Sequence, residues 1–148
     1  MKSYLVPLEL LNLQNNGYHL LVEVIIYNQP YYMVLDTGAS KTVFDKTGLE
    51  KHISTEDLLN SDKVSTGLGT NAMESFLIHL PVLQIGKLKL SNFEAAVLDL
   101  SSISAAYQFL ELPPVIGVLG GDILQQYDAL IDYQKLQLKL RLKDANLT

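Results

Sequence analysis

An apolar run that ends in one carboxylate and a glycine turn constrains this chain more than any other feature. Residues 31–35, Tyr-Tyr-Met-Val-Leu, have the composition of a β-strand, and Asp36, Thr37 and Gly38 follow with residues suited to a tight turn. A carboxylate at the end of a buried strand is costly unless it is hydrogen-bonded or neutralised, so the backbone N–H groups and threonine hydroxyl of a turn suit it. This pattern is typical of an active-site loop, although an aspartate there can also simply cap a turn.

The composition indicates one folded domain. With 148 residues, of which 48% are apolar and 18% charged, the chain can bury a core without disulfides or a metal and is too apolar to be disordered. We therefore expect a single domain over residues 1–148. The net charge of −5 argues against nucleic acid as a partner, and the absence of cysteine excludes disulfides, thiolate zinc sites and thiol catalysis.

The sequence predicts neither a secretion signal nor a membrane span. Residues 1–9 lack a long apolar core and a small-residue cleavage site, and the longest apolar runs are too short to cross a bilayer. We expect a cytoplasmic protein, although a chain without cysteine is compatible with either redox environment.

Alternating hydrophobicity predicts an all-β fold. Residues 5–13 and 18–27 should form an opening hairpin around the Gln-Asn-Asn-Gly sequence at 14–17, because Asn and Gly tolerate positive φ. Apolar and polar side chains alternate along the second run, which is typical of a half-buried strand. A turn over residues 28–30 should then return the chain to the strand that ends at Asp36.

The rest of the chain continues this pattern with one or two short helices. Further strands are predicted at 41–44, 63–66, 73–79, 82–85, 87–90, 93–98, 115–119, 129–132 and 136–142. A helical patch is expected around 55–59, and a helix over 102–109 should begin with Asp99 or Ser101 as its cap. Asp122 is expected to cap another short helix after a Gly-Gly turn.

Three short motifs follow one another at a characteristic spacing. Residues 36–40 read Asp-Thr-Gly-Ala-Ser, residues 67–71 read Gly-Leu-Gly-Thr-Asn between two predicted strands, and residues 118–124 read Val-Leu-Gly-Gly-Asp-Ile-Leu. Together they resemble the catalytic loop, the flap and the glycine-then-helix element of the retropepsin-like aspartic proteases, the retroviral type (clan AA) in its cellular and bacterial form. Residues 129–133 also look like the strand that follows that helix in these relatives.

The resemblance implies a retropepsin-like acid protease barrel with a flap hairpin, and an aspartic endopeptidase activity. It makes Asp36 the catalytic carboxylate, one of two that activate a water to attack a peptide carbonyl. Two close carboxylates that share a proton split their pKa values, which supplies a base beside an acid. Because the chain has one Asp-Thr-Gly, we expect a symmetric homodimer in which the Asp36 side chains of both subunits meet at the two-fold axis.

The resemblance also assigns roles to neighbouring residues. The Thr37 hydroxyl is expected to bond across the dimer, Gly38 to let the backbone approach the site, and Gly120 to let its strand pass behind the catalytic loop. The implied substrate-binding residues are Ala39 in the loop and Gly67, Leu68 and Gly69 at the flap tip. The expected partners are a peptide or protein substrate and a second copy of the chain; no cofactor or metal is implied.

Other interpretations are weaker. Residues 67–72 fit a Gly-x-Gly-x-x-Ala dinucleotide fingerprint, but the following residues 73–79 are strand-like, so the required helix is missing. Ser40 lacks the glycines of a nucleophile elbow. The three histidines, His19, His52 and His79, have no metal-ligand spacing and are expected at the surface or in the core. The alternative to an enzyme is a retropepsin-like binding or dimerisation module with weak or no hydrolysis, since a fold does not fix a function.

Overall fold

The computed structural model describes residues 2–59, 62–66 and 73–143. Within these residues the strands are β1 (Lys2–Asn12), β2 (Tyr18–Ile26), β3 (Gln29–Leu35), β4 (Val43–Asp45), β5 (Asp62–Thr66), β6 (Met73–Ile85), β7 (Leu88–Leu98), β8 (Val115–Leu119), β9 (Leu130–Asp132) and β10 (Gln137–Leu142). The helices are α1 (Lys46–Leu49), α2 (Thr55–Leu59), α3 (Ser101–Phe109) and α4 (Gly121–Gln126). The predicted all-β class is confirmed, with four short helices in the described residues where one or two were expected.

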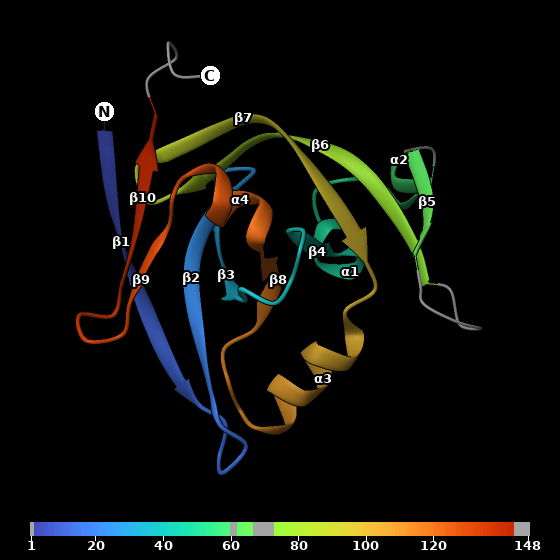
Figure 1. The fold of residues 1–148 in the computed structure, drawn as a ribbon. Helices are drawn as coiled ribbons and strands as arrows, with labels where there is room; N and C mark the ends of the chain where they lie inside the picture. The colour runs from blue at the N-terminus through green and yellow to red at the C-terminus, as the bar shows by residue number, and fades with distance from the viewer. Residues whose placement is uncertain (1, 60–61, 67–72, 144–148) are drawn as a thin grey trace.

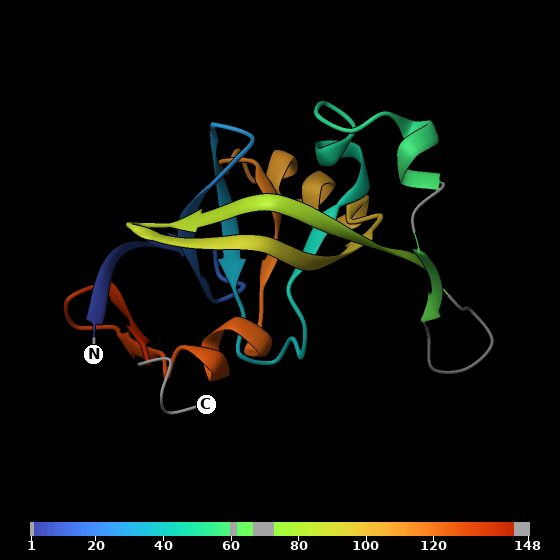
Figure 2. The same cartoon turned by 90° about the horizontal axis from the view of Figure 1, so that it is seen from above.

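The ten strands of the described residues form one hydrogen-bonded sheet in the order β5-β6-β7-β4-β8-β3-β2-β1-β10-β9. An additional antiparallel pairing joins β6 to β2, with Ile85 opposite Val24. The long β6–β7 hairpin therefore arches over the strands that end near the candidate site (Figures 1 and 2). Strand β3 lies in the middle of the sheet, antiparallel to β2 and parallel to β8, so the residue that follows it is carried by a rigid element.

Strand β2 is buried on one face and also, at Leu21, on the other, which is more than its half-buried pattern predicts. The predicted inward face is confirmed by four buried side chains, Leu20, Val22, Val24 and Ile26. Leu21 is also fully buried, because α3 covers the opposite face and packs Tyr107 against it. A second, smaller core thus forms between α3 and the β2–β3 pair, beside the larger core inside the curved sheet.

The predicted opening hairpin is confirmed, and the turn after it lies earlier than expected. Tyr27 and Asn28 have φ values of 51° and 62°, the geometry of a two-residue turn whose twist suits antiparallel strands. Gln29 and Pro30 already belong to β3, where Pro30 lies opposite Ile25. The prediction of a turn at 28–30 was wrong by about one residue, because the turn lies at Tyr27 and Asn28 and Pro30 belongs to the following strand.

Strands β6 and β7 are each continuous where the sequence predicted two shorter strands. The break expected after residue 79 is absent because Pro81 lies at a point where the ladder with β7 skips a pair. Asn92 faces this gap on β7 with a φ of 52°. A proline there removes no ladder hydrogen bond, so both strands run on.

Asp45 fixes two helices that flank the sheet. Its side chain accepts hydrogen bonds from the Gly48 N–H at 3.2 Å, which caps α1, and from the Leu100 N–H at 2.9 Å, just before α3. Asp99 accepts a hydrogen bond from the Ser101 N–H at 2.9 Å, and this bond lowers the pKa of the Asp99 carboxyl. The prediction that Asp99 or Ser101 caps α3 is wrong, because Leu100 occupies the cap position, from which no side chain caps the helix.

The two terminal strands close the sheet within one chain. Strand β1 pairs with β10, with Leu5 opposite Lys139, and β10 pairs in turn with β9 (Figure 1). Leu138 and Leu140 are fully buried, which confirms the predicted inward face of the last strand. Strand β9 is left as an edge of the sheet.

Candidate active site

Asp36 leaves the sheet directly at the end of β3. Its N–H donates to the Leu119 carbonyl at 3.0 Å, one residue past the β3–β8 ladder. The Asp36 Oδ1 atom accepts a hydrogen bond from the Gly38 N–H at 2.8 Å, and the Ala39 N–H donates to the Asp36 carbonyl at 3.2 Å. The turn thus holds the carboxylate through the Gly38 N–H, and the Ala39 N–H closes the turn on the Asp36 backbone.

The open side of this loop faces solvent in the single chain. Asp36, Thr37 and Gly38 are all exposed. In the part of the chain that the structure describes, the Thr37 hydroxyl has no hydrogen-bond partner, so the turn itself does not use it. The sequence predicted that this hydroxyl would suit the carboxylate within the turn, whereas the Gly38 N–H makes that contact.

Gly120 allows β8 and α4 to pass directly behind the Asp36 loop, as predicted. A Cβ atom at this position would lie 2.7 Å from the Ala39 carbonyl oxygen and 2.9 Å from the Lys41 carbonyl group, closer than side-chain atoms are found. The next residue, Gly121, donates its N–H to the same Ala39 carbonyl at 2.7 Å. The loop is therefore held from behind by backbone contacts that only glycine permits.

A buried threonine and a helix aspartate tie the other end of the loop to α4. Thr42 is fully buried; its hydroxyl donates to Asp122 Oδ1 at 2.7 Å and accepts from the Gly120 N–H at 3.0 Å. The Thr42 N–H also donates to Asp122 Oδ1, at 2.9 Å. Asp122 was predicted to cap α4, which is wrong: Gly120 holds the cap position, and the Asp122 carboxylate binds Thr42 instead.

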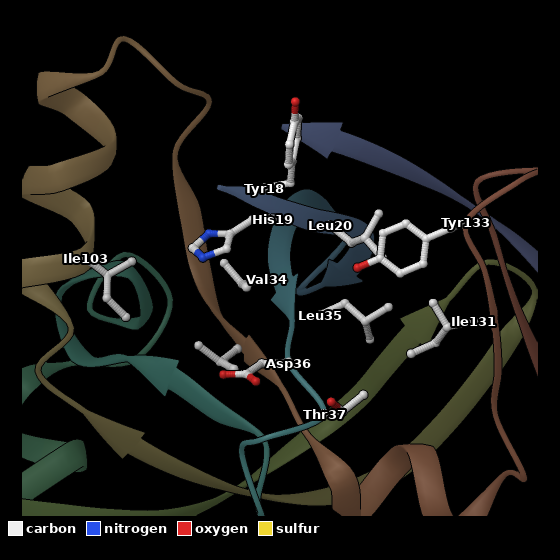
Figure 3. Close-up of a pocket in the computed structure, with 11 residues that line it drawn as sticks. Tyr18, His19, Leu20, Val34, Leu35, Asp36, Thr37, Ile103, Ile131 and Tyr133 are labelled. Atoms are coloured by element: carbon white, nitrogen blue, oxygen red, sulfur yellow. The ribbon is translucent and has the colours of Figure 1, made fainter. Parts of the chain in front are cut away.

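A pocket of about 450 Å³ opens beside Asp36 (Figure 3). Its lining residues are Tyr18, His19, Leu20, Val34, Leu35, Asp36, Thr37, Ile103, Val118, Ile131 and Tyr133. Figure 3 shows Ile103 and His19 on one side of Asp36, toward α3, and Ile131 and Tyr133 on the other, toward β9. We name these two halves the α3 side and the β9 side. Both are mainly apolar, so the carboxylate stands between two surfaces suited to apolar groups.

His19 also lines this pocket, and the sequence alone did not connect it with Asp36. Its Nδ1 atom lies 2.6 Å from the Tyr107 hydroxyl, and the two rings stack with centroids 5.9 Å apart. His52 stacks on Tyr27 instead, and His79 lies near Glu94 on the surface. The register of the β2–β3 hairpin brings His19 beside Asp36. Counted back from the turn at Tyr27 and Asn28, the two residues occupy facing positions on neighbouring strands.

The predicted flap tip, Gly67, Leu68 and Gly69, lies outside the described residues. The two strands that flank it are described and form the predicted hairpin, with Thr66 opposite Met73. In the described ranges, no group of three metal-ligating side chains could hold a metal ion. None of the helices in these ranges is long and apolar enough to span a membrane.

Comparisons with known proteins agree with this geometry. A family model described as aspartyl protease matches residues 22–123. A retropepsin-like aspartic protease from Rickettsia conorii is similar in structure, with a TM-score of 0.56 and 22% identity, over 94% of this chain and 88% of that one. The retroviral protease-like domain of Ddi1 from Leishmania major gives a TM-score of 0.57 and 16% identity, over 85% of this chain and 94% of that one. No curated protein matches the sequence.

Proposed function

Because the chain belongs to the aspartyl protease family, we propose that it is an aspartic endopeptidase in which Asp36 activates the water that attacks a peptide bond. The observation that carries this proposal is the position of the Asp36 carboxylate. It is oriented by the Gly38 N–H, stands on a loop held from behind by Gly120 and Thr42, and opens onto an apolar pocket. A purely structural turn has no need for an exposed carboxylate oriented toward a cavity.

The chemistry requires a second carboxylate, which we assign to Asp36 of a second copy of the chain. One ionised Asp36 takes a proton from the water as its oxygen bonds to the peptide carbonyl carbon, and the other, protonated Asp36 gives its proton to the carbonyl oxygen. When the tetrahedral intermediate collapses, the C–N bond breaks and a proton passes to the leaving amine. In a two-fold symmetric dimer the same residue supplies both acid and base.

The β9 side of the pocket is the surface we assign to the partner subunit. Tyr133 is 64% exposed there, and Ile131 lies beside the Asp36 loop (Figure 3). Exposed apolar side chains that gather next to a site are typical of interfaces. A partner packed on them would cover the open face of the loop, where we propose that the Thr37 hydroxyl bonds across the dimer and Gly38 permits the close approach.

We also propose that Ala39 and the flap residues Gly67, Leu68 and Gly69 bind the substrate backbone. An extended peptide would lie between the catalytic loop and the β5–β6 hairpin that carries the flap, pairing main chain with main chain. Closure over the peptide would exclude water from the reacting groups.

A second candidate, a binding or dimerisation module without hydrolysis, is favoured by one observation. In the described residues β1 and β10 each pair with a strand on both sides inside one chain, so these two strands need no partner and β9 is the edge strand. A chain that remained monomeric would present one exposed carboxylate, which lacks the acid that the reaction needs.

Asp36→Asn separates the two candidates. The substitution keeps the size of the side chain and an oxygen for the Gly38 N–H, but it removes the base, so cleavage of a mixed peptide library should fall by roughly a hundredfold to ten-thousandfold. Asp57→Asn, a matched change at an exposed carboxylate on α2, should leave cleavage unchanged. Full activity of Asp36→Asn would sink the assignment, and absence of cleavage by the unaltered protein would favour the module.

A further inference from the structure

The register of the β2–β3 hairpin places His19 opposite Asp36. The ladder ends with Leu20 opposite Leu35, so the next pair outward is His19 and Asp36. Side chains alternate between the two faces of a strand, which puts both residues on the face that α3 covers. Figure 3 shows His19 and Ile103 on the same side of Asp36. Both His19 and Asp36 line the same pocket, and no ion pair between them is found within the described ranges, so a group bound in the pocket can contact both.

Tyr107 holds the His19 ring in place. The Tyr107 hydroxyl lies 2.6 Å from His19 Nδ1, and the tyrosine is only 4% exposed, packed in the small core under α3. Burial raises the pKa of Tyr107, so its hydroxyl stays protonated. With Nδ1 engaged, Nε2 is the ring nitrogen left for the pocket, and within the described residues it has no hydrogen-bond partner.

The remainder of the α3 side is apolar. Val34, Ile103 and Val118 line it together with the His19 ring. An apolar group bound there would leave Nε2 without a partner in a partly desolvated space, which costs free energy. A side chain with an apolar body and a hydrogen-bonding tip would satisfy both parts of the surface.

We propose that His19 is a specificity-determining residue that selects tyrosine at the substrate position next to the cleaved bond. This inference rests on the proposed endopeptidase function. The tip must be neutral, because the Asp36 carboxylate opposite repels an anion and the apolar walls disfavour any unpaired charge. A long aromatic body covers the apolar walls of the α3 side better than a short hydroxylated side chain, which would leave much of that apolar surface uncovered.

Matched peptides that differ only at the residue before the cleaved bond test the proposal. The unaltered protein should cleave the tyrosine peptide with a kcat/KM about threefold to tenfold above that of the phenylalanine peptide, the gain expected from one hydrogen bond. His19→Phe should abolish this preference while phenylalanine and leucine peptides remain substrates. His19→Gln, which keeps a polar group near the position of Nε2, should retain part of it.

Two further variants separate a direct contact from a structural effect. Tyr107→Phe frees the His19 ring and should weaken the tyrosine preference without loss of phenylalanine cleavage. His79→Phe, the same substitution at an exposed histidine on β6, should leave the preference unchanged. Calorimetry with Asp36→Asn measures the affinity of the same peptides without cleavage. The tyrosine peptide should bind more tightly than the phenylalanine peptide.

The possible failures are distinguishable. Equal cleavage of tyrosine and phenylalanine peptides by the unaltered protein, or a tyrosine preference that survives in His19→Phe, would overturn the inference and leave the endopeptidase function standing. If no peptide is cleaved, the proposed function fails. In that case, equal binding of the two peptides to Asp36→Asn would also overturn the inference.

Discussion

Gly120 and Gly121 are adjacent in sequence but play unequal parts behind the catalytic loop. A Cβ atom on Gly120 would meet the Ala39 carbonyl oxygen at 2.7 Å, whereas on Gly121 it would lie 3.4 Å from the same oxygen, an ordinary contact. The first glycine is therefore required by backbone packing and the second is not. Because the neighbours of Gly120 are main-chain atoms, they cannot move aside without shifting Asp36.

Gly120→Ala should lower the free energy of unfolding by about 1–3 kcal/mol and reduce cleavage, because the forced shift displaces the loop that carries Asp36. Gly121→Ala is the matched control: it lies in the first turn of α4, where alanine is favoured over glycine, so stability should stay the same or rise slightly. Urea unfolding followed by circular dichroism measures both. Equal stability of the two variants would contradict the close approach.

At the residue scale, the sequence predicted the loop and Gly120 behind it, but it did not predict the support from Thr42 and Asp122. Asp36, Thr37, Gly38 and Ala39 were identifiable because the string Asp-Thr-Gly-Ala-Ser after a predicted strand resembles the catalytic loop of the retropepsin-like aspartic proteases. The partnership of Thr42 with Asp122 joins residues 80 positions apart, so no local pattern reveals it. Asp122 resembled a helix cap because the buried threonine that competes for its carboxylate was not visible in the sequence.

The last strand, β10, is attached to the end of α4 by a backbone hydrogen bond and by an ion pair. The Arg141 N–H donates to the Tyr127 carbonyl at 2.7 Å. Asp128, just after α4, accepts a hydrogen bond from Arg141 Nη2 at 2.6 Å and lies 3.4 Å from Lys143 Nζ. The hydrogen bond from Arg141, with the nearby Lys143 charge, lowers the pKa of the Asp128 carboxyl.

This lowered pKa sets the pH range in which the contact stabilises the protein. A carboxyl whose pKa is lower in the folded than in the unfolded chain stabilises the fold above its unfolded value, roughly pH 4, and loses that effect as the pH falls through the folded value. Asp128→Asn should therefore lower Tm slightly at pH 7 and have no effect at the lowest pH. The contact is on the surface, so 1 M salt should diminish the difference at pH 7. A Tm difference between Asp128→Asn and the unaltered protein that is the same at pH 7 and at the lowest pH would contradict this account.

At the element scale, local alternation was enough to predict most strands but not their partners. The opening hairpin and the flap-bearing hairpin follow from nearby turn signals. The parallel pairs β3–β8 and β4–β7 join distant segments, and they decide where the Asp36 loop emerges. Helix α1 was missed because four residues carry no periodic pattern; its cap, Asp45, was read as part of a polar segment.

The whole molecule is a curved sheet with one exposed carboxylate loop between an α3 side and a β9 side. The α3 side carries His19, and the β9 side carries exposed apolar residues (Figure 3). This asymmetry is expected if each subunit supplies half of an active site, with one surface for a substrate side chain and another for the second subunit. The central claim is therefore that a single chain is an incomplete enzyme.

Sedimentation across a concentration range, with cleavage of a peptide library followed on the same samples, tests this claim most directly. Cleavage per chain should rise in proportion to the dimer fraction, because only the dimer brings two Asp36 carboxylates together. Full cleavage by a species that sediments as a monomer at every concentration would contradict the account.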